Sequence, residues 1–294
     1  MLALKGDKIN ATAFIATPAE NIITAYTIPH RSRCRFTTFQ AFRDFLEEGY
    51  KKWQYKSESQ YIAIEGATDK LVESIDKNRR DLPRMRLDYD ATNERLIIKF
   101  ASNEHDLAHE QFSAMLTDHV RALGITRRQL ASVGTGRTLG SNNRSKEPDK
   151  GFKPGTRGGA NDKPTLIFEA GLSETLNQLR NDAYYWLTKT NGEVKIVLLF
   201  HIKRAAKTIE LERWENRPNP RPTRSNSSAQ RPTKIQELQI QVPAAGPTIV
   251  MGGPLVLPVN LIFDIIPPGV LTTGLTITDP ELSTYAEEYF DLTQ

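Results

Sequence analysis

The spacing of apolar residues divides the chain into a helical beginning and a strand-rich remainder. Residues 37–53 place aromatic and aliphatic side chains at helical spacing, which predicts an amphipathic helix. A second helix is indicated over residues 66–77. We therefore expect residues 1–83 to form a helical N-terminal region.

After that region the period of the pattern changes. A turn-rich spacer separates two extended runs, 84–89 and 95–100, and this arrangement predicts a β-hairpin. An apolar face over residues 104–123 then predicts a helix, for which Ser102 or Asn103 is a suitable N-cap.

Three consecutive segments predict an α/β core. The apolar stretch 164–171 is typical of a buried strand, a helical pattern follows it, and a long apolar strand ends near residue 202. The order strand–helix–strand predicts a right-handed β-α-β unit. We expect the core to span residues 84–215, with a mixed central sheet flanked by helices.

The last eighty residues change in composition. Residues 216–234 carry four prolines, five basic residues and no acidic ones, which predicts a basic, proline-rich loop that is either simply solvated or in contact with a polyanion. Strand-like runs follow, and the final stretch is typical of a short helix capped by Asp279. We expect residues 235–294 to form a β-rich extension packed on the core.

The overall composition limits the location of the protein more than its function. The 294 residues carry a formal charge of +4, so only a local concentration of charge can argue for a polyanion partner. Cys34 is the one cysteine, which rules out disulfides and cysteine-based zinc sites within the chain. With no apolar run of about 18 residues and no secretion signal, we expect an intracellular protein of the cytoplasm or nucleus, without a membrane segment.

Glu169 is the first candidate for chemistry, because it is a lone carboxylate in an apolar strand. Asp149 precedes it by twenty positions. If the two segments pair, their carboxylates point to one spot, and a cation is needed to relieve their repulsion. Mg²⁺ or Mn²⁺ suits such a pair, because Mg²⁺ prefers oxygen ligands and requires only one or two carboxylates.

At these residues the chain resembles a known family. The "PD" at 148–149 and the "IFEAG" at 167–171 are similar to the signature of PD-(D/E)XK, restriction-endonuclease-like nucleases. The helix and apolar strand that follow resemble its Uma-type branch, and residues 84–215 are similar to uncharacterised fungal proteins placed near it. The resemblance implies a restriction-endonuclease-like fold and metal-dependent hydrolysis of DNA or RNA. Homodimers are common among such folds.

One position departs from the family signature. Gly171 stands where the signature has its lysine. A cation is needed to orient water or to stabilise charge in the transition state. In this superfamily the lysine can come from another element, and we expect Lys195, or else Arg180, to replace it.

The helix over 104–123 supplies further candidates. The resemblance implies an acidic metal ligand from this helix, and Glu110 or Glu104 is suited to that role. His105 and His109 share a helical face, but the H-E-x-x-H zinc pattern is absent. Hydrogen-bonded histidines at a helix end are the plainer alternative.

The glycine-rich segment 134–163 is the candidate nucleic-acid contact. Its basic side chains are suited to neutralising a phosphate backbone, whereas the alternative is an ordinary disordered insertion. The predicted contacts are Arg137, Arg144, Lys146, Lys150, Lys153 and Arg157.

These observations leave three hypotheses. The first is a metal-dependent nuclease with Asp149 and Glu169 at its centre. The second is a catalytically inactive nuclease-like module that binds nucleic acid or a protein partner. The third is a scaffold in which Glu169 is simply ion-paired. The first requires an ammonium or guanidinium group close to both carboxylates.

Overall fold

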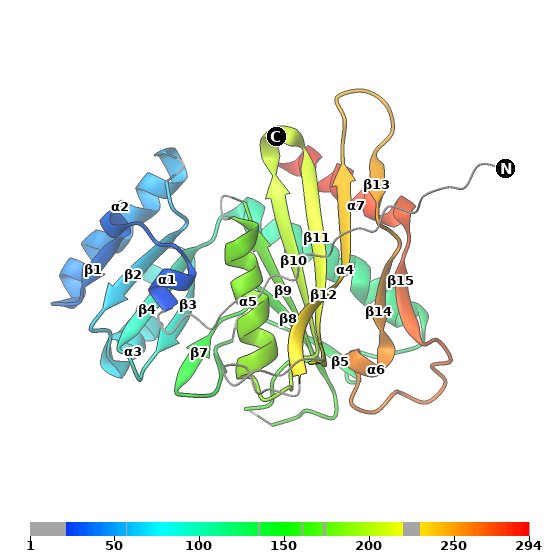
Figure 1. Cartoon of the computed structure of the whole chain (residues 1–294), viewed down its shortest axis with the longest axis horizontal. Coiled ribbons are helices and arrows are strands. Elements are labelled where there is room, and N and C mark those ends of the chain that lie inside the picture. The colour runs from blue at the N-terminus through cyan, green and yellow to red at the C-terminus, as the bar shows by residue number, and fades with distance from the viewer. Residues whose placement is uncertain are drawn as a thin grey trace.

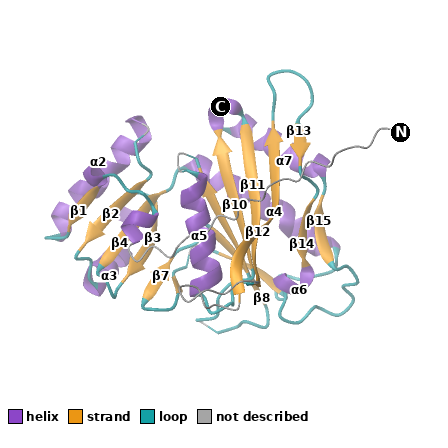
Figure 2. Ribbon diagram, viewed as in Figure 1, coloured by secondary structure: helices purple, strands orange, loops and turns teal. Residues whose placement is uncertain are grey.

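The protein has a mixed α/β architecture with two sheets side by side, each flanked by helices (Figures 1 and 2). The computed structural model describes residues 22–56, 58–134, 136–159, 161–172, 175–219 and 230–293. Its α-helices are α1 (Ile22–Ala25), α2 (Phe39–Lys56), α3 (Asp69–Lys77), α4 (Asn103–Ala122), α5 (Leu176–Lys189), α6 (Val259–Ile262) and α7 (Asp279–Leu292). Short 3-10 helices occur at His30–Ser32, Arg79–Asp81 and Arg204–Ala206.

The first sheet is built mainly from the N-terminal third of the chain. Its strands lie in the order β1 (Arg33–Arg35), β2 (Tyr61–Glu65), β4 (Arg95–Phe100), β3 (Met85–Asp90), β7 (Arg144–Lys146) and β6 (Thr138–Leu139). The predicted hairpin is confirmed as β3 and β4, which pair antiparallel. Apolar residues of α2 and α3 bury one face of this sheet, and α1 contributes to a smaller cluster with β2 and β4.

The second sheet contains the predicted core. Its strands lie in the order β13 (Ile249–Met251), β12 (Gln230–Gln241), β11 (Thr208–Pro218), β10 (Ile196–Lys203), β9 (Leu166–Gly171), β8 (Lys150–Pro154) and β5 (Leu130–Val133). β9 and β10 pair parallel across α5, which confirms the β-α-β unit. β8 pairs antiparallel with β9, so the segments after Asp149 and around Glu169 are neighbours.

Helices cover both faces of the second sheet, which explains the continuous apolar sequences of β9 and β10. Figure 1 shows α5 in front of the sheet and α4 and α7 behind it. Phe112 of α4 packs against Phe168 and Phe200 on one face, whereas Trp186 of α5 belongs to the apolar cluster on the other. A small ladder of β14 (Leu255–Pro258) and β15 (Gly274–Ile277) joins the α4 side.

Three boundaries differ from the sequence prediction. The region expected to be helical, 1–83, contains β1 and β2, because these short strands complete a sheet whose other members come later in the chain. The expected start of the core at residue 84 therefore falls within the first sheet. Strands β11 and β12 run into the predicted loop 216–234, of which 220–229 lie outside the described residues.

The C-terminal helix follows the prediction, with Thr278 rather than Asp279 as its N-cap. Among the described helices, none is both long and apolar enough to cross a bilayer.

Candidate functional site

The site forms at the end of β9 that extends beyond its pairing with β8. β8 begins at Lys150, which pairs with Phe168, so the backbone groups of Ala170 extend beyond the β8 ladder. A buried backbone donor or acceptor must find another partner. The Ala170 N–H donates to Asp149 Oδ2 at 2.9 Å, and its carbonyl accepts from Lys99 Nζ at 2.7 Å. The unpaired backbone groups at this end of β9 thus bind the charged side chains of Asp149 and Lys99 in the interior.

Lys99 brings the two predicted carboxylates together. Its Nζ lies 3.0 Å from Asp149 Oδ2 and 3.6 Å from Glu169 Oε2. All three side chains are buried, with 4% or less of each side chain exposed. Lys99 belongs to β4 of the first sheet, so the site is assembled between the two sheets. Asp149 and Glu169 do meet at a shared cation, and in this structure that cation is an ammonium group.

His105 completes the surroundings of Asp149. Ser102 caps α4 by accepting from the His105 backbone N–H at 3.1 Å, which places His105 in the first helical turn. Its Nε2 lies 2.9 Å from the Ala170 carbonyl and 3.1 Å from Asp149 Oδ2, and its Nδ1 lies 3.3 Å from Asp106 Oδ1. Both ring nitrogens face acceptors, which favours the doubly protonated ring.

The two carboxyl groups have opposite pKa shifts. Burial alone would raise the pKa of Asp149, but His105, Lys99 and Arg86 together hold that pKa well below its usual range. Burial raises the pKa of Glu169 well above its usual range, and the nearby charge of Asp149 raises it further. Glu169 Oε1 accepts from Trp186 Nε1 at 2.6 Å. One acid is therefore held ionised while its neighbour tends to keep its proton, as expected for adjacent buried carboxylates.

We call this group the Asp149 cluster, and its members are Arg86, Lys99, His105, Asp106, Asp149 and Glu169. Two features of it suit a divalent cation. Asp149 Oδ1 is buried without a hydrogen-bond partner in the described part of the chain, although Arg86 Nε lies 3.5 Å away. The pKa of Glu169 is raised by burial and by the charge of Asp149, and a nearby divalent cation would lower it again. Two carboxylates in reach of one point are sufficient protein ligands for Mg²⁺ or Mn²⁺.

A second group with little exposure, which we call the Asp88 cluster, joins the first sheet to α5. Its members are Tyr26, Asp88, Arg144, Lys146 and Asp182. Arg144 Nε donates to Asp88 Oδ1 at 2.7 Å, and Lys146 Nζ lies 2.8 Å from Asp182 Oδ1. The Tyr26 hydroxyl contacts both carboxylates. Each carboxylate in this cluster thus has a close cation.

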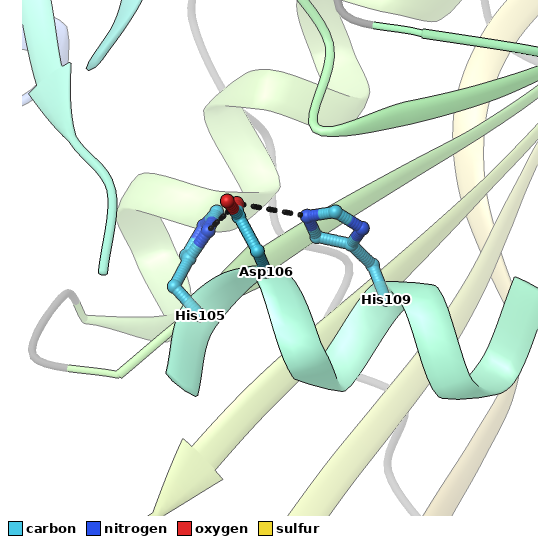
Figure 3. A group of neighbouring side chains, drawn as sticks. All are labelled: His105, Asp106 and His109. Atoms are coloured by element: carbon cyan, nitrogen blue, oxygen red, sulfur yellow. Dashed lines mark hydrogen bonds and ion pairs between the residues drawn. The ribbon is translucent and has the colours of Figure 1, made fainter. Parts of the chain in front are cut away.

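A third feature lies on α4, where three adjacent side chains point to one place (Figure 3). His105 Nδ1 and His109 Nε2 both lie 3.3 Å from Asp106 Oδ1. Burial lowers the pKa of His109, which therefore stays neutral at neutral pH. Hydrogen bonds from both histidines and the charge of Arg86 overcome the effect of burial and lower the pKa of Asp106.

The structure corrects the expected source of the cation. Lys195 precedes β10 and its backbone N–H bonds to Thr165, whereas Glu169 is level with Leu199 in the ladder. Four residues along a strand correspond to about 13 Å, so Lys195 lies near the far end of the strand. Arg180 forms a double hydrogen bond with Glu212 of β11, which is separated from β9 by β10.

The expected acidic ligands on α4 are also placed elsewhere. Glu110 binds Lys150 at 2.8 Å on the surface, and Glu104 binds Arg204 at 2.5 Å. Asp106 is the acid of this helix that enters the Asp149 cluster, through His105 and Arg86. Asp106 lies two positions after Glu104 and four positions before Glu110 in the helix.

Most of the predicted nucleic-acid contacts have internal partners. Within the Asp88 cluster, Lys146 is buried and Arg144 is partly buried, with 5% and 17% of their side chains exposed. Three others form ion pairs, namely Arg137 with Asp76, Lys150 with Glu110, and Arg157 with Asp264. Lys153 bonds instead to a carbonyl oxygen, that of Gly159, at 3.4 Å. Composition had indicated a basic surface, but folding pairs most of its charge with acids.

A sequence signal for Lys99 did exist. It stands in the apolar run "LIIKF", as Glu169 stands in "LIFEAG". A lone charge in a buried strand needs a partner in both cases.

Comparisons with known proteins add little to this geometry. No family model and no curated protein matches the chain. Among solved structures it is similar to a "putative nuclease belonging to DUF820" from Anabaena variabilis, with 12% identity and a TM-score of 0.38 over 71% of this chain and 97% of that one. A likeness this weak carries no argument about fold or activity. It also does not support the predicted membership of the Uma-type branch.

Proposed function

We propose that the protein hydrolyses phosphodiester bonds of DNA or RNA, with Mg²⁺ or Mn²⁺, at the Asp149 cluster. One observation carries the proposal: a single ammonium, that of Lys99, lies 3.0 Å from Asp149 and 3.6 Å from Glu169. Two acids and a lysine at one buried point match the chemistry that the PD-(D/E)XK resemblance implies. A cation held by the two acids supplies Lewis-acid polarisation of the phosphate and a more acidic water.

Each residue of the cluster has a distinct part in this proposal. Asp149 and Glu169 would hold the divalent metal ion. Lys99 stabilises negative charge that develops on the phosphate in the transition state. His105 orients Asp149 through Nε2 and is itself held by Asp106. The backbone of Ala170 fixes both Asp149 and Lys99, so their relative position does not depend on side-chain packing alone.

A nucleic-acid substrate needs a cationic surface beside the cluster. Lys153 is the predicted contact residue that engages no acid in the described structure, so we assign it a phosphate contact outside the cluster, four residues or about 13 Å along β8 from Asp149. Cleavage of both strands of a duplex would bring two copies of the chain together as a homodimer.

The test is a cleavage assay on mixed DNA and RNA substrates with Mg²⁺ or Mn²⁺. Asp149→Asn and Glu169→Gln are expected to abolish cleavage, and Glu110→Gln, on the surface of α4, is expected to retain it. Circular dichroism of each variant separates lost chemistry from lost folding. Equal cleavage by wild type and Glu169→Gln would refute the proposal.

A second function, binding without cleavage, is favoured by one specific observation. The carboxylate of Asp149 is 0% exposed and already faces three cations, Arg86, Lys99 and His105. A divalent ion must compete with these charges for the same oxygens. A wild-type protein that binds nucleic acid but cleaves none under any metal condition would support this function instead.

A further inference from the structure

We propose that α4 carries a separate transition-metal site, suited to Zn²⁺ or Co²⁺, formed by His105 Nδ1, Asp106 Oδ1 and His109 Nε2. This inference goes beyond the proposed hydrolysis and does not depend on it. The three side chains come from one helical segment and converge on one point (Figure 3). His105 and His109 are four residues apart, so the helix itself sets their common face.

The distances suit coordination better than they suit strong hydrogen bonds. Both ring nitrogens lie 3.3 Å from Asp106 Oδ1, and the three ligand atoms all lie within 4.8 Å of one another. Hydrogen bonds to a carboxylate are usually about 2.7–2.9 Å when the donor is charged. Tetrahedral zinc with bonds of about 2.0–2.1 Å keeps its ligand atoms about 3.3 Å apart. The two distances from the carboxylate already have this value.

Nε2 of His105, the ring nitrogen that does not face the proposed metal, has the partner that a metal-binding histidine requires. Such a histidine normally donates its second N–H to a carboxylate or a backbone carbonyl, which fixes the ring and its tautomer. His105 Nε2 lies 3.1 Å from Asp149 Oδ2 and 2.9 Å from the Ala170 carbonyl. The ring is therefore held with Nδ1 directed at Asp106, and a metal ion bound there would displace the proton that Nδ1 otherwise directs at this carboxylate.

His109 provides a second, independent observation. Only 2% of its side chain is exposed, and its Nδ1 has no hydrogen-bond partner among the described residues. A buried ring nitrogen without a partner is uncommon and needs an explanation. The Glu110 carboxylate lies 3.9 Å from Nδ1 and is half exposed, so it is placed to accept this N–H once Nε2 binds a metal.

The remaining contacts of Asp106 set its orientation. Arg86 donates to Oδ1 at 3.1 Å, and Arg84 donates to Oδ2. These guanidinium groups hold the carboxylate in place. Two imidazoles and one carboxylate favour zinc-like ions over Mg²⁺, and three protein ligands leave a fourth position open.

The experiment uses the full chain after treatment with a chelator. Co²⁺ is titrated while its visible absorption is recorded, and Zn²⁺ is titrated by calorimetry. We expect one ion per chain, with tetrahedral cobalt bands, and X-ray absorption of the zinc form should show two imidazole ligands. Excess Mg²⁺ should not displace the ion, because Mg²⁺ takes oxygen ligands.

Variants separate this site from other histidines and from the acid pair. His109→Gln should weaken binding by at least about 100-fold, and Asp149→Asn by about 10- to 100-fold through its bond to His105. His119→Gln should bind as wild type, since His119 is on the same helix but pairs with Glu281 at the surface. Glu169→Gln should also bind as wild type, which distinguishes this site from the proposed catalytic one.

Two results would overturn the proposal. One is a wild-type protein that binds no Co²⁺ or Zn²⁺ at micromolar concentration. The other is a folded His109→Gln protein with unchanged affinity and spectrum, which would mean that the three residues form only a hydrogen-bond network. Either result would leave the question of phosphodiester hydrolysis untouched.

Discussion

The Asp88 cluster joins the first sheet to α5 and the Asp149 cluster joins the first sheet to the second, yet the charges of the two clusters are matched differently. In the Asp88 cluster, two cations face two carboxylates and a phenol. Nearby cations outweigh burial and lower the pKa of Asp88, and acids likewise raise the pKa of Lys146. In the Asp149 cluster, the pKa of Glu169 moves in the direction that disfavours its charge.

This difference in charge matching indicates which cluster stabilises the fold and which is suited to chemistry. Partners that stabilise each other's charge are arranged for folding, and the Asp88 cluster has that form. An acid such as Glu169, whose ionised form is disfavoured in the folded protein, does not stabilise the fold through its charge. The presence of an acid at this position of a buried strand therefore needs another reason. Perturbed acids beside a lysine are typical of functional sites. We therefore propose a functional role for the Asp149 cluster and a structural role for the Asp88 cluster, which joins the first sheet to α5.

The largest expected effect comes from breaking the Asp88 cluster. Lys146→Met leaves Asp182 and Asp88 with one fewer buried cation, and removing one partner of a buried pair costs about 3–5 kcal/mol. Urea unfolding should show this loss. Lys150→Met is the control, because its partner Glu110 is largely exposed and the pair is worth about 1 kcal/mol or less. Similar losses in both variants would remove the distinction between buried and surface pairs.

The two acids of the Asp149 cluster should respond differently to neutralisation. Asp149→Asn removes a charge that holds Lys99 and His105, and we expect it to lower the unfolding free energy by about 2 kcal/mol, less than for Lys146→Met, because Glu169 can then ionise beside Lys99. Glu169→Gln should change it by less than about 0.5 kcal/mol, because the native Glu169 already tends to keep its proton. Denaturant unfolding at neutral pH in the presence of a chelator measures both. A larger loss for Glu169→Gln would contradict the opposite pKa shifts.

The pH dependence of stability should also differ between the two clusters, beginning with Glu169. An unfolded glutamate loses its proton near pH 4.3, whereas Glu169 keeps it to higher pH. Wild type should therefore lose stability relative to Glu169→Gln as the pH rises above about 4, by at most about 1.4 kcal/mol per pH unit.

Asp88 should have the opposite effect. Its pKa is lowered in the folded protein, so its contribution is complete above about pH 3.9 and disappears as the pH falls through the folded value. Comparing wild type with Asp88→Asn from pH 3 to pH 7 measures this contribution. An advantage of wild type that grows toward low pH would be inconsistent with it.

The smallest expected effect belongs to Lys195. It lies at the far end of the strand from Glu169, so Lys195→Gln should change the unfolding free energy by less than about 0.5 kcal/mol and leave cleavage intact. Thermal unfolding and the cleavage assay measure the two effects. Loss of cleavage in a stable Lys195→Gln protein would restore the lysine expected from the sequence.

Local patterns in the sequence predicted the local structure well. Helical spacing and the Ser102 cap located α4, and the apolar runs around the β9–α5–β10 unit gave its order and its parallel pairing. The proximity of Asp149 and Glu169 was also predicted, because they lie on adjoining segments of one antiparallel pair. These features depend on neighbours in the sequence or in one ladder.

Features that depend on the packing of the two sheets were not predicted. Lys99 reaches Asp149 and Glu169 from another sheet, and strand periodicity says which face a residue occupies but not what lies opposite. The internal partners of Arg144 and Lys146 were missed for the same reason, since composition counts charges without pairing them. Asp106 was missed because the helical phase of α4 relative to β9 follows from that same packing.

Cleavage by Lys99→Met, compared with wild type, tests the assignment of the Asp149 cluster most directly. The methionine keeps most of the buried volume and removes only the ammonium that lies against both carboxylates. With Mg²⁺ or Mn²⁺, we predict that wild type cleaves nucleic acid and that folded Lys99→Met is slower by about 100-fold or more. Equal rates for the two proteins, or no cleavage by either one, would contradict the assignment.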